Sequence, residues 1–456
     1  MSRYKAYPDY KDAESKWLDI LPKDWKRAPL KYLVAIRITD GPHETPEFVD
    51  EGVPFLSAEA VKNNKLDFTK KRGCITRALH EVYSKKCLPQ LDDVFMIKSG
   101  NTTGNIAIVE TNEEFNIWSP LALIRSDKCK VLPRFVFYSM CADYFKTSVE
   151  LSWSQGTQPN IGMGVIENLH IPVGSIEEQQ TIANFLDHET AKIDTLIAKQ
   201  QELIKLLTEK RQAVISHAVT KGLNPNAPMR DSGVEWLGEV PLHWKVASLK
   251  YLVSAPIIDG PHLTPTRKEE GIPFISAEAV SQGYINFEKK WGYISEEDHQ
   301  LFSKRYCPQR GDILVVKLGA TTGTVAIVET DEAFNVWVPL ATIRTKNDVP
   351  SKFVFYLLQS VHVRDAFQVS WTFGTQQTLG LGTLANLSFP IPVKDEALKI
   401  VEFIESKIPT FDRLINECEV SYMLLQERRT ALISAAVTGK IDVRDWQAIS
   451  DTALAA

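Results

Sequence analysis

Nearly the whole of this 456-residue chain is an internal repeat, and this repeat constrains the fold more than any other feature. DGPHETP begins at Asp40 and DGPHLTP begins at Asp259, so the two copies are offset by 219 residues. The same register joins PFLSAEAV to PFISAEAV and KSGNTTGNIAIVET to KLGATTGTVAIVET. One residue is lost near Pro133 and Pro350, and the offset is then 218 to the end of each copy. A tandem duplication of this length predicts two similarly folded units.

Each copy has two parts that differ in periodicity. Residues 30–172 and 249–392 contain short β-rich runs such as IAIVE and DILVVK, separated by Gly, Pro, Asn and Asp. This pattern predicts an α+β domain built around antiparallel sheet. Residues 177–220 and 396–438 have almost no Gly, and their apolar residues recur at spacings of three and four, which predicts long helices with a coiled-coil-like seam.

The ends of the two helices carry recognisable signals. Lys221-Gly222 and Gly439-Lys440 are typical of helix stops. Pro409 stands where the first copy has Ala191, and proline predicts a break near the start of the second helix.

An apolar seam of this length needs a partner, and the chain supplies two matching helices. We expect them to pack together, either antiparallel or parallel, and antiparallel packing would relate the copies by a pseudo-twofold axis. The alternatives are that each helix packs on its own domain or associates with another chain. The residues expected between the helices are Ile193, Leu196, Leu203, Leu207, Val214, Phe411, Leu414, Leu425 and Leu432.

Charge and composition limit the function. The net charge of −5 argues against an isolated basic nucleic-acid-binding domain, although an acidic protein can carry a basic face or share the contact with a partner. The six cysteines have no metal-ligand spacing, so we expect no metal site. The N-terminal residues are polar and no apolar run could cross a bilayer, so we expect a cytoplasmic protein.

Catalytic motifs are missing from both copies. The sequence has no phosphate-binding G-x-x-x-x-G-K-[ST] loop, no dinucleotide G-x-G-x-x-G turn, no G-x-S-x-G elbow and no H-E-x-x-H pair. The Asn/Asp-Pro-Pro-aromatic tetrapeptide of adenine methyltransferases is also absent. We therefore expect a protein that is not itself an enzyme and binds no cofactor.

Three repeated segments are candidates for contact with a ligand. The first is the Asp-Gly-Pro-His turn, which is either a capped turn or a set of polar groups at a DNA groove. The second is a Gly-Thr loop, either a simple hairpin or a phosphate-contacting loop. The third is a Gln-rich loop beside Trp153 and Trp371, where Gln could read adenine and Trp could equally belong to the core. The candidate residues are Thr39, Asp40, His43, Asp259 and His262 in the first, Lys98, Thr102, Thr103, Lys317, Thr321 and Thr322 in the second, and Gln155, Gln158, Gln376 and Gln377 in the third.

The repeat resembles a known family, the specificity subunits of type I restriction-modification enzymes. The family pattern is two target-recognition domains, each followed by a long helix, with W-L-G-x-x-P-x-x-W opening the second half. Here Trp236, Leu237, Gly238, Pro241 and Trp244 match that segment. The first copy, from Trp17 to Trp25, departs from it at Asp19, where Gly is usual.

The resemblance implies a non-catalytic subunit that binds a bipartite, asymmetric target in double-stranded DNA. Its implied partners are two modification subunits, which methylate adenine with S-adenosylmethionine, and restriction subunits that use ATP and Mg²⁺. A two-headed scaffold, an RNA-binding protein and a duplicated enzyme using His43 and His262 are the alternatives. The expected organisation is an N-terminal segment (1–28), a first target-recognition domain (29–172), a central helix (173–222), a connector (223–247), a second target-recognition domain (248–392), a C-terminal helix (393–440) and a tail (441–456).

Overall fold

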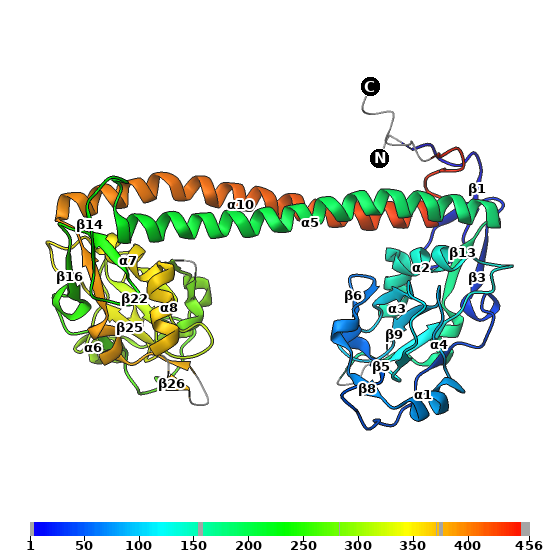
Figure 1. The fold of residues 1–456 in the computed structure, drawn as a ribbon, viewed down its shortest axis with the longest axis horizontal. Helices are drawn as coiled ribbons and strands as arrows, with labels where there is room; N and C mark the ends of the chain where they lie inside the picture. Colours follow the sequence, from blue (N-terminus) through cyan, green and yellow to red (C-terminus); the bar gives the residue numbers. More distant parts are fainter. Residues whose placement is uncertain (1–3, 154–157, 282, 371, 374–376, 448–456) are drawn as a thin grey trace. The chain divides into compact units, whose positions relative to one another are not determined.

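The computed structural model describes residues 4–153, 158–281, 283–370, 372–373 and 377–447. It confirms the predicted α+β fold, with two related globular domains and two long helices (Figure 1). The chain forms two compact units, one of Met1–Gln201 with Val420–Ala456 and the other of Glu202–Glu419. Each unit therefore contains one globular domain and a part of both long helices.

The first unit is built on a four-stranded antiparallel sheet in the order β10-β9-β12-β4. A second sheet, β11-β5-β8, combines a parallel and an antiparallel pair, and β13-β3, β1-β2 and β6-β7 form two-stranded pairs. Its strands are β1 (Tyr10–Asp12), β2 (Ile20–Pro22), β3 (Lys26–Pro29), β4 (Thr39–Asp40), β5 (Val53–Leu56), β6 (Val61–Lys62), β7 (Lys65–Leu66), β8 (Gly73–Ile75), β9 (Val94–Ile97), β10 (Ile106–Ile108), β11 (Asn116–Ile117), β12 (Leu121–Ile124) and β13 (His170–Val173). Its helices before the long one are η1 (Leu30–Tyr32), η2 (Ala58–Ala60), η3 (Phe68–Lys70), α1 (Arg77–Ser84), α2 (Pro133–Cys141), α3 (Asp143–Glu150) and α4 (Met163–Asn168).

The second unit repeats this topology, with sheets β17-β25-β22-β23 and β21-β18-β24. Its strands are β14 (Met229–Asp231), β15 (Glu239–Pro241), β16 (Lys245–Ser248), β17 (Ile258–Asp259), β18 (Ile272–Ile275), β19 (Val280–Ser281), β20 (Tyr284–Ile285), β21 (Gly292–Ile294), β22 (Ile313–Val316), β23 (Val325–Ile327), β24 (Asn335–Val336), β25 (Leu340–Ile343), β26 (Thr372–Phe373), β27 (Gln377–Thr378) and β28 (Ser388–Ile391). Its shorter helices are η4 (Leu249–Tyr251), η5 (Ala277–Ala279), η6 (Phe287–Lys289), α6 (Glu296–Ser303), α7 (Ser351–Gln359), α8 (Val361–Ser370) and α9 (Leu381–Asn386).

The central strands of each unit are buried on both faces. In β9, Val94 and Met96 join the core beneath α2, whereas Phe95 and Ile97 join the core shared with β5 and β11. Successive side chains of a strand point to opposite faces, so a strand buried on both faces is apolar throughout. This burial explains why the strand sequences are continuous apolar runs.

The two long helices are α5 (Ile176–Lys221) and α10 (Lys394–Val437). Their ends agree with the predicted stops, because Gly222 and Gly439 adopt φ of 77° and 69°, which favours glycine. The expected break at Pro409 is wrong, since α10 continues through this residue. Proline removes one helical hydrogen bond, but the preceding turns are held by Ile404 and Ile408, which are buried in the core of the second unit.

Within each unit, the segments of α5 and α10 lie side by side and antiparallel (Figure 1). In the first unit, Gln201 donates to the Tyr422 hydroxyl at 3.3 Å, and Arg429 forms an ion pair with Asp194. The residues expected in the seam differ in burial: Ile193 is 5% exposed, whereas Leu196 and Leu203 are 46% and 43% exposed. The middle of α5 therefore contributes less apolar packing than its repeating pattern predicts, whereas the expected residues of α10 are half-buried. In the described part of the chain, no helix is both long and apolar enough to span a membrane.

Each globular domain also packs against the long helix of the other copy. Asp143, at the start of α3, donates its backbone N–H to Ser434 Oγ on α10 at 3.0 Å. Val361, at the start of α8, makes the equivalent bond to Ser216 Oγ on α5 at 2.9 Å. The last turns of α10 thus complete the core of the first unit, and the last turns of α5 complete that of the second.

Candidate nucleic-acid interface

The first and second predicted segments meet around the carboxylate of Asp40, at the end of β4. Asp40 is 6% exposed and forms ion pairs with Lys86 at 2.7 Å and Lys98 at 3.1 Å, and its carboxylate lies 3.2 Å from His43 Nε2. Burial would raise the pKa of Asp40, but hydrogen bonds from Lys86 and Lys98 outweigh it and hold this pKa below its ordinary value. Asp40 therefore remains charged and fixes three basic side chains at one edge of the sheet.

The second copy builds the same cluster with one substitution. Asp259 is 4% exposed and contacts Arg305 at 2.7 Å, Lys317 at 3.1 Å and His262 at 3.3 Å. Against the effect of burial, these basic groups lower the pKa of Asp259, with Lys317 contributing most. Arg305 and Lys86 were not among the predicted residues, although a basic residue at this position of both copies was a signal that could have found them.

A close backbone approach positions the Asp-Gly-Pro-His turn. A Cβ atom on Gly41 would lie 1.8 Å from the carbonyl oxygen of Ile117, so no other residue fits without movement. The next residue, Pro42, accepts a hydrogen bond from the Ser119 N–H at 3.1 Å. This docking leaves the side chain of His43 70% exposed while it contacts Asp40.

The two threonines of the Gly-Thr loop differ in burial and bonding in each copy. Thr103 is buried, and its hydroxyl donates to the carbonyls of Gly100 at 2.7 Å and Pro159 at 3.1 Å. Thr322 makes the matching bonds to Gly319 and Gln377. These two hydroxyls hold the loop to the third segment, whereas Thr102 and Thr321 are both exposed.

The third segment lies beside the Gly-Thr loop in both units. In the first, the Gly100 N–H donates to the Pro159 carbonyl at 3.1 Å, which places the exposed side chain of Gln158 next to this loop. In the second, Gln377 is half-buried and its carbonyl accepts from Gly319 at 3.1 Å. Gln155 and Gln376 lie outside the described residues. The three segments, distant in sequence, are thus brought together in each copy.

Another polar network repeats in both units but serves the fold. His80 Nδ1 lies 2.6 Å from Asn116 Oδ1, and both residues are buried between α1 and β11. His299 and Asn335 repeat this contact at 2.6 Å. Buried polar groups need such partners, so we assign these histidines to the packing of α1 and α6.

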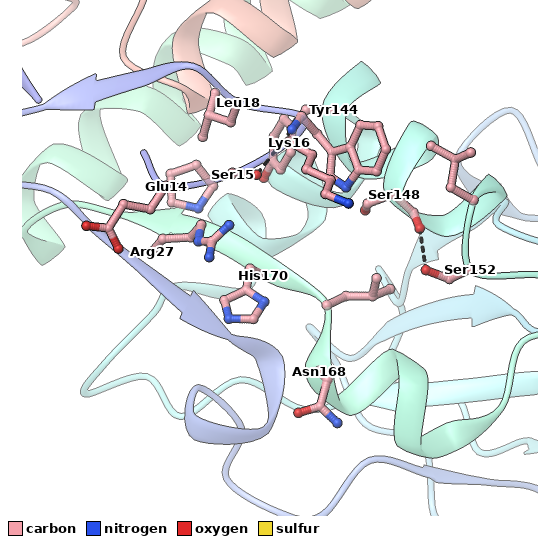
Figure 2. Close-up of a pocket in the computed structure, with 14 residues that line it drawn as sticks. Glu14, Ser15, Lys16, Leu18, Arg27, Tyr144, Ser148, Ser152, Asn168 and His170 are labelled. Carbon is pink, nitrogen blue, oxygen red and sulfur yellow. Dashed lines mark hydrogen bonds between the residues drawn. The ribbon is translucent and has the colours of Figure 1, made fainter. Parts of the chain in front are cut away.

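A cavity of about 410 Å³ lies in the first unit between the N-terminal segment, β3, α3 and β13. Figure 2 shows Arg27 and His170 on one side of it and Ser148 and Ser152 on the other. Burial, with the nearby charges of Arg27 and Lys31, lowers the pKa of His170, which favours its neutral form. This lining is not repeated in the second copy, because Lys16, Arg27 and His170 correspond to Glu235, Val246 and Ser388.

Among the described residues, no cluster of His, Cys, Asp or Glu could hold a metal ion. The site that recurs in both copies is a surface where His, Thr and Gln side chains lie beside basic groups that pair with a buried carboxylate. Such groups can donate to phosphate oxygens and base edges.

Comparison with known proteins places this repeat in one family. The model of the type I restriction modification DNA specificity domain matches residues 22–206 and again residues 241–417. The chain is 24% identical to the putative type I restriction enzyme MjaX specificity subunit of Methanocaldococcus jannaschii, over 95% of this chain and 98% of the relative. It is 21% identical to the type I restriction enzyme StySPI specificity subunit of Salmonella potsdam, over 94% and 91%.

A solved chain from a study of complex assembly and conformational transition of the type I R-M system has a similar fold. The TM-score is 0.68 at 16% identity, and the match covers 92% of this chain and 99% of the solved one. Because the family model matches both copies and most of the sequence, the chain belongs to the type I restriction modification DNA specificity domain family.

Proposed function

We propose that this protein is the DNA sequence-specificity subunit of a type I restriction-modification complex, and that it binds a bipartite, asymmetric target in double-stranded DNA. The observation that carries the proposal is the repetition of one ion-paired cluster, around Asp40 and Asp259, in two domains that each match the family. Each domain would read one half of the target. Because one chain carries two such domains, its DNA target would consist of two half-sites.

The residues beside the repeated cluster differ between the copies, which is the basis of the asymmetry. Asn101 in the Gly-Thr loop corresponds to Ala320, and Pro159 in the third segment corresponds to Gln377. A side-chain amide can bond to a base edge where a methyl group can make only an apolar contact. The two domains, although built alike, would therefore present different base-contacting side chains to the two half-sites.

The chain would act without chemistry of its own. Two modification subunits carrying S-adenosylmethionine would methylate adenine in the bound target, and restriction subunits with ATP and Mg²⁺ would cleave DNA. This chain supplies recognition and the surfaces on which those subunits assemble, and the complex would work in the cytoplasm.

Reconstitution with the modification subunits tests the proposal. The assembled complex should methylate a defined bipartite sequence, and the purified chain alone should transfer no methyl group. Binding should be competed by duplex DNA containing the target and not by RNA of the same sequence. Methyl transfer by the chain alone, or preferential competition by RNA, would contradict the assignment.

A further inference from the structure

The β6–β7 hairpin of the first unit carries a concentration of positive charge that the rest of the protein does not share. Residues 62–72 contain five basic residues and one acidic residue, in a chain whose net charge is −5. Four of the basic residues are exposed lysines, and no described carboxylate lies within ion-pair distance of them. We call these four, Lys62, Lys65, Lys70 and Lys71, the lysine surface.

The geometry of the hairpin makes this charge costly. Lys62 and Lys65 are directly paired across the strands, on either side of a two-residue turn in which Asn63 and Asn64 adopt φ of 52° and 63°. Like charges in opposite positions of an antiparallel pair destabilise it. Asp67 caps η3 by accepting a hydrogen bond from the Thr69 N–H at 3.0 Å, and its charge acts on Lys62 and Lys70 only from beyond ion-pair distance.

The second copy shows that the hairpin does not need lysine to fold. Ser281 and Tyr284 occupy the paired positions in β19 and β20, with the same register. Residues 281–291 contain two basic residues and one acidic residue. The cross-strand lysine pair is thus particular to the first domain, and no packing requirement of the shared fold explains it.

The hairpin is fixed in place at the start of β10, just after the Gly-Thr loop of its own unit. Asn64 Nδ2 donates to the Ile106 carbonyl at 3.2 Å, which anchors the turn to β10. Beyond Lys71, the Arg72 guanidinium lies 4.9 Å from the centre of the Trp118 ring. Ser119, the residue after Trp118, donates to Pro42 in the Asp-Gly-Pro-His turn, so Arg72, at the end of the basic segment, contacts the neighbour of a residue that binds this turn.

We propose that the lysine surface binds backbone phosphates of the DNA beside the half-site read by the first domain, and that the second domain has no equivalent contact. The proposal rests on the proposed DNA-binding function. Phosphate contacts of this kind add affinity and fix the position of a protein without selecting bases. The first domain would supply more of the salt-dependent binding, and the second would depend more on its contacts with bases.

The test compares charge removal at this surface with equal charge removal elsewhere in the same unit. Lys62→Gln/Lys65→Gln is assembled with the modification subunits, and binding to a duplex with the mapped target is measured over a range of salt. The slope of log K against log salt should become shallower by up to about 1.8, because each lost phosphate contact contributes roughly 0.9. The methylated sequence should be unchanged, and the thermal stability equal to or above that of the wild type.

The matched control is Lys11→Gln/Lys26→Gln, which removes two exposed lysines from β1 and β3 and should leave the slope unchanged. Methylphosphonate substitution flanking the first half-site should weaken binding by the wild type and not by Lys62→Gln/Lys65→Gln. An unchanged slope in Lys62→Gln/Lys65→Gln would overturn the proposal while the wild type still binds its target specifically. Loss of the modification subunits with an unchanged slope would also overturn it, by showing that the surface binds an acidic protein. Failure of the wild type to prefer any duplex would instead contradict the proposed function itself.

Discussion

Arg429 Nε donates to Asp194 Oδ1 at 2.7 Å, joining the C-terminal part of α10 to the N-terminal part of α5. The duplicated residues repeat the bond in the second unit, where Arg211 Nε donates to Asp412 Oδ1 at 2.7 Å. Parallel pairing in register would place Asp194 beside Asp412, and like charges at such positions repel. Antiparallel pairing instead gives each carboxylate a guanidinium.

We expect this antiparallel register to be detectable by cross-linking. In a chain whose exposed Cys129 and Cys307 are replaced by serine, Asp194→Cys/Arg429→Cys should be joined by a short bis-maleimide in most molecules. Mass spectrometry of the linked peptides measures the yield. The control Asp194→Cys/Asp412→Cys joins positions that only a parallel pair would bring together, and intramolecular linkage in that variant would show the register to be wrong.

Asp40→Asn should destabilise the first unit and weaken DNA binding. Lys86 and Lys98 would lose their buried counter-charge, and we expect a cost of about 1–3 kcal/mol, below that of a fully buried pair because Lys86 is half exposed. The lowered pKa makes the ionised form of Asp40 stabilising above the ordinary value of 3.8, and this stabilisation is lost as pH falls through the folded-state pKa.

Denaturation at several pH values measures this effect. The stability difference between the wild type and Asp40→Asn should be constant near neutral pH and shrink below about pH 4. Asp50→Asn, at an exposed residue, is the matched control and should have little effect. A difference that does not change with pH would mean that Asp40 acts through shape and not charge.

Gly41→Ala should damage the Asp-Gly-Pro-His turn. The added methyl group would collide with the Ile117 carbonyl oxygen and push the turn from β11, at a cost of about 3 kcal/mol in unfolding free energy. Gly164→Ala adds the same group inside α4, where nothing lies within 4 Å, and should be neutral or stabilising by roughly 0.5–1 kcal/mol. Equal melting temperatures for the two variants would show that the close approach is not needed.

Replacing residues 30–170 with the corresponding domain of a relative should change one half of the methylated sequence and leave the other half as it was. The physical reason is that each half-site is read by a different copy of the same cluster. Sequencing of methylated genomic DNA from cells carrying the hybrid measures both halves. A change in both halves, or in neither, would contradict the assignment of one domain to each half-site.

The amino-acid sequence alone determined the duplication, the α+β character of both domains and the two long helices, because repeats and periodicity are local properties of a chain. It also singled out Asp40, Lys98 and the Gly-Thr loop, since each stands in both copies. The positive φ of Gly222 follows from the same kind of local signal, a glycine directly after a helix.

Only the tertiary structure decided how these parts meet. Ser434 of the second copy binds Asp143 of the first, and Lys86 completes the Asp40 cluster from 46 residues away in sequence. It also decided that Thr103 is buried and holds the loop together, whereas its neighbour Thr102, a residue of the same type, is exposed. Pro409 stays within a helix because the buried side chains around it stabilise that helix by more than proline costs. These outcomes depend on contacts between distant residues, and no local pattern encodes which of several competing contacts has the lower free energy.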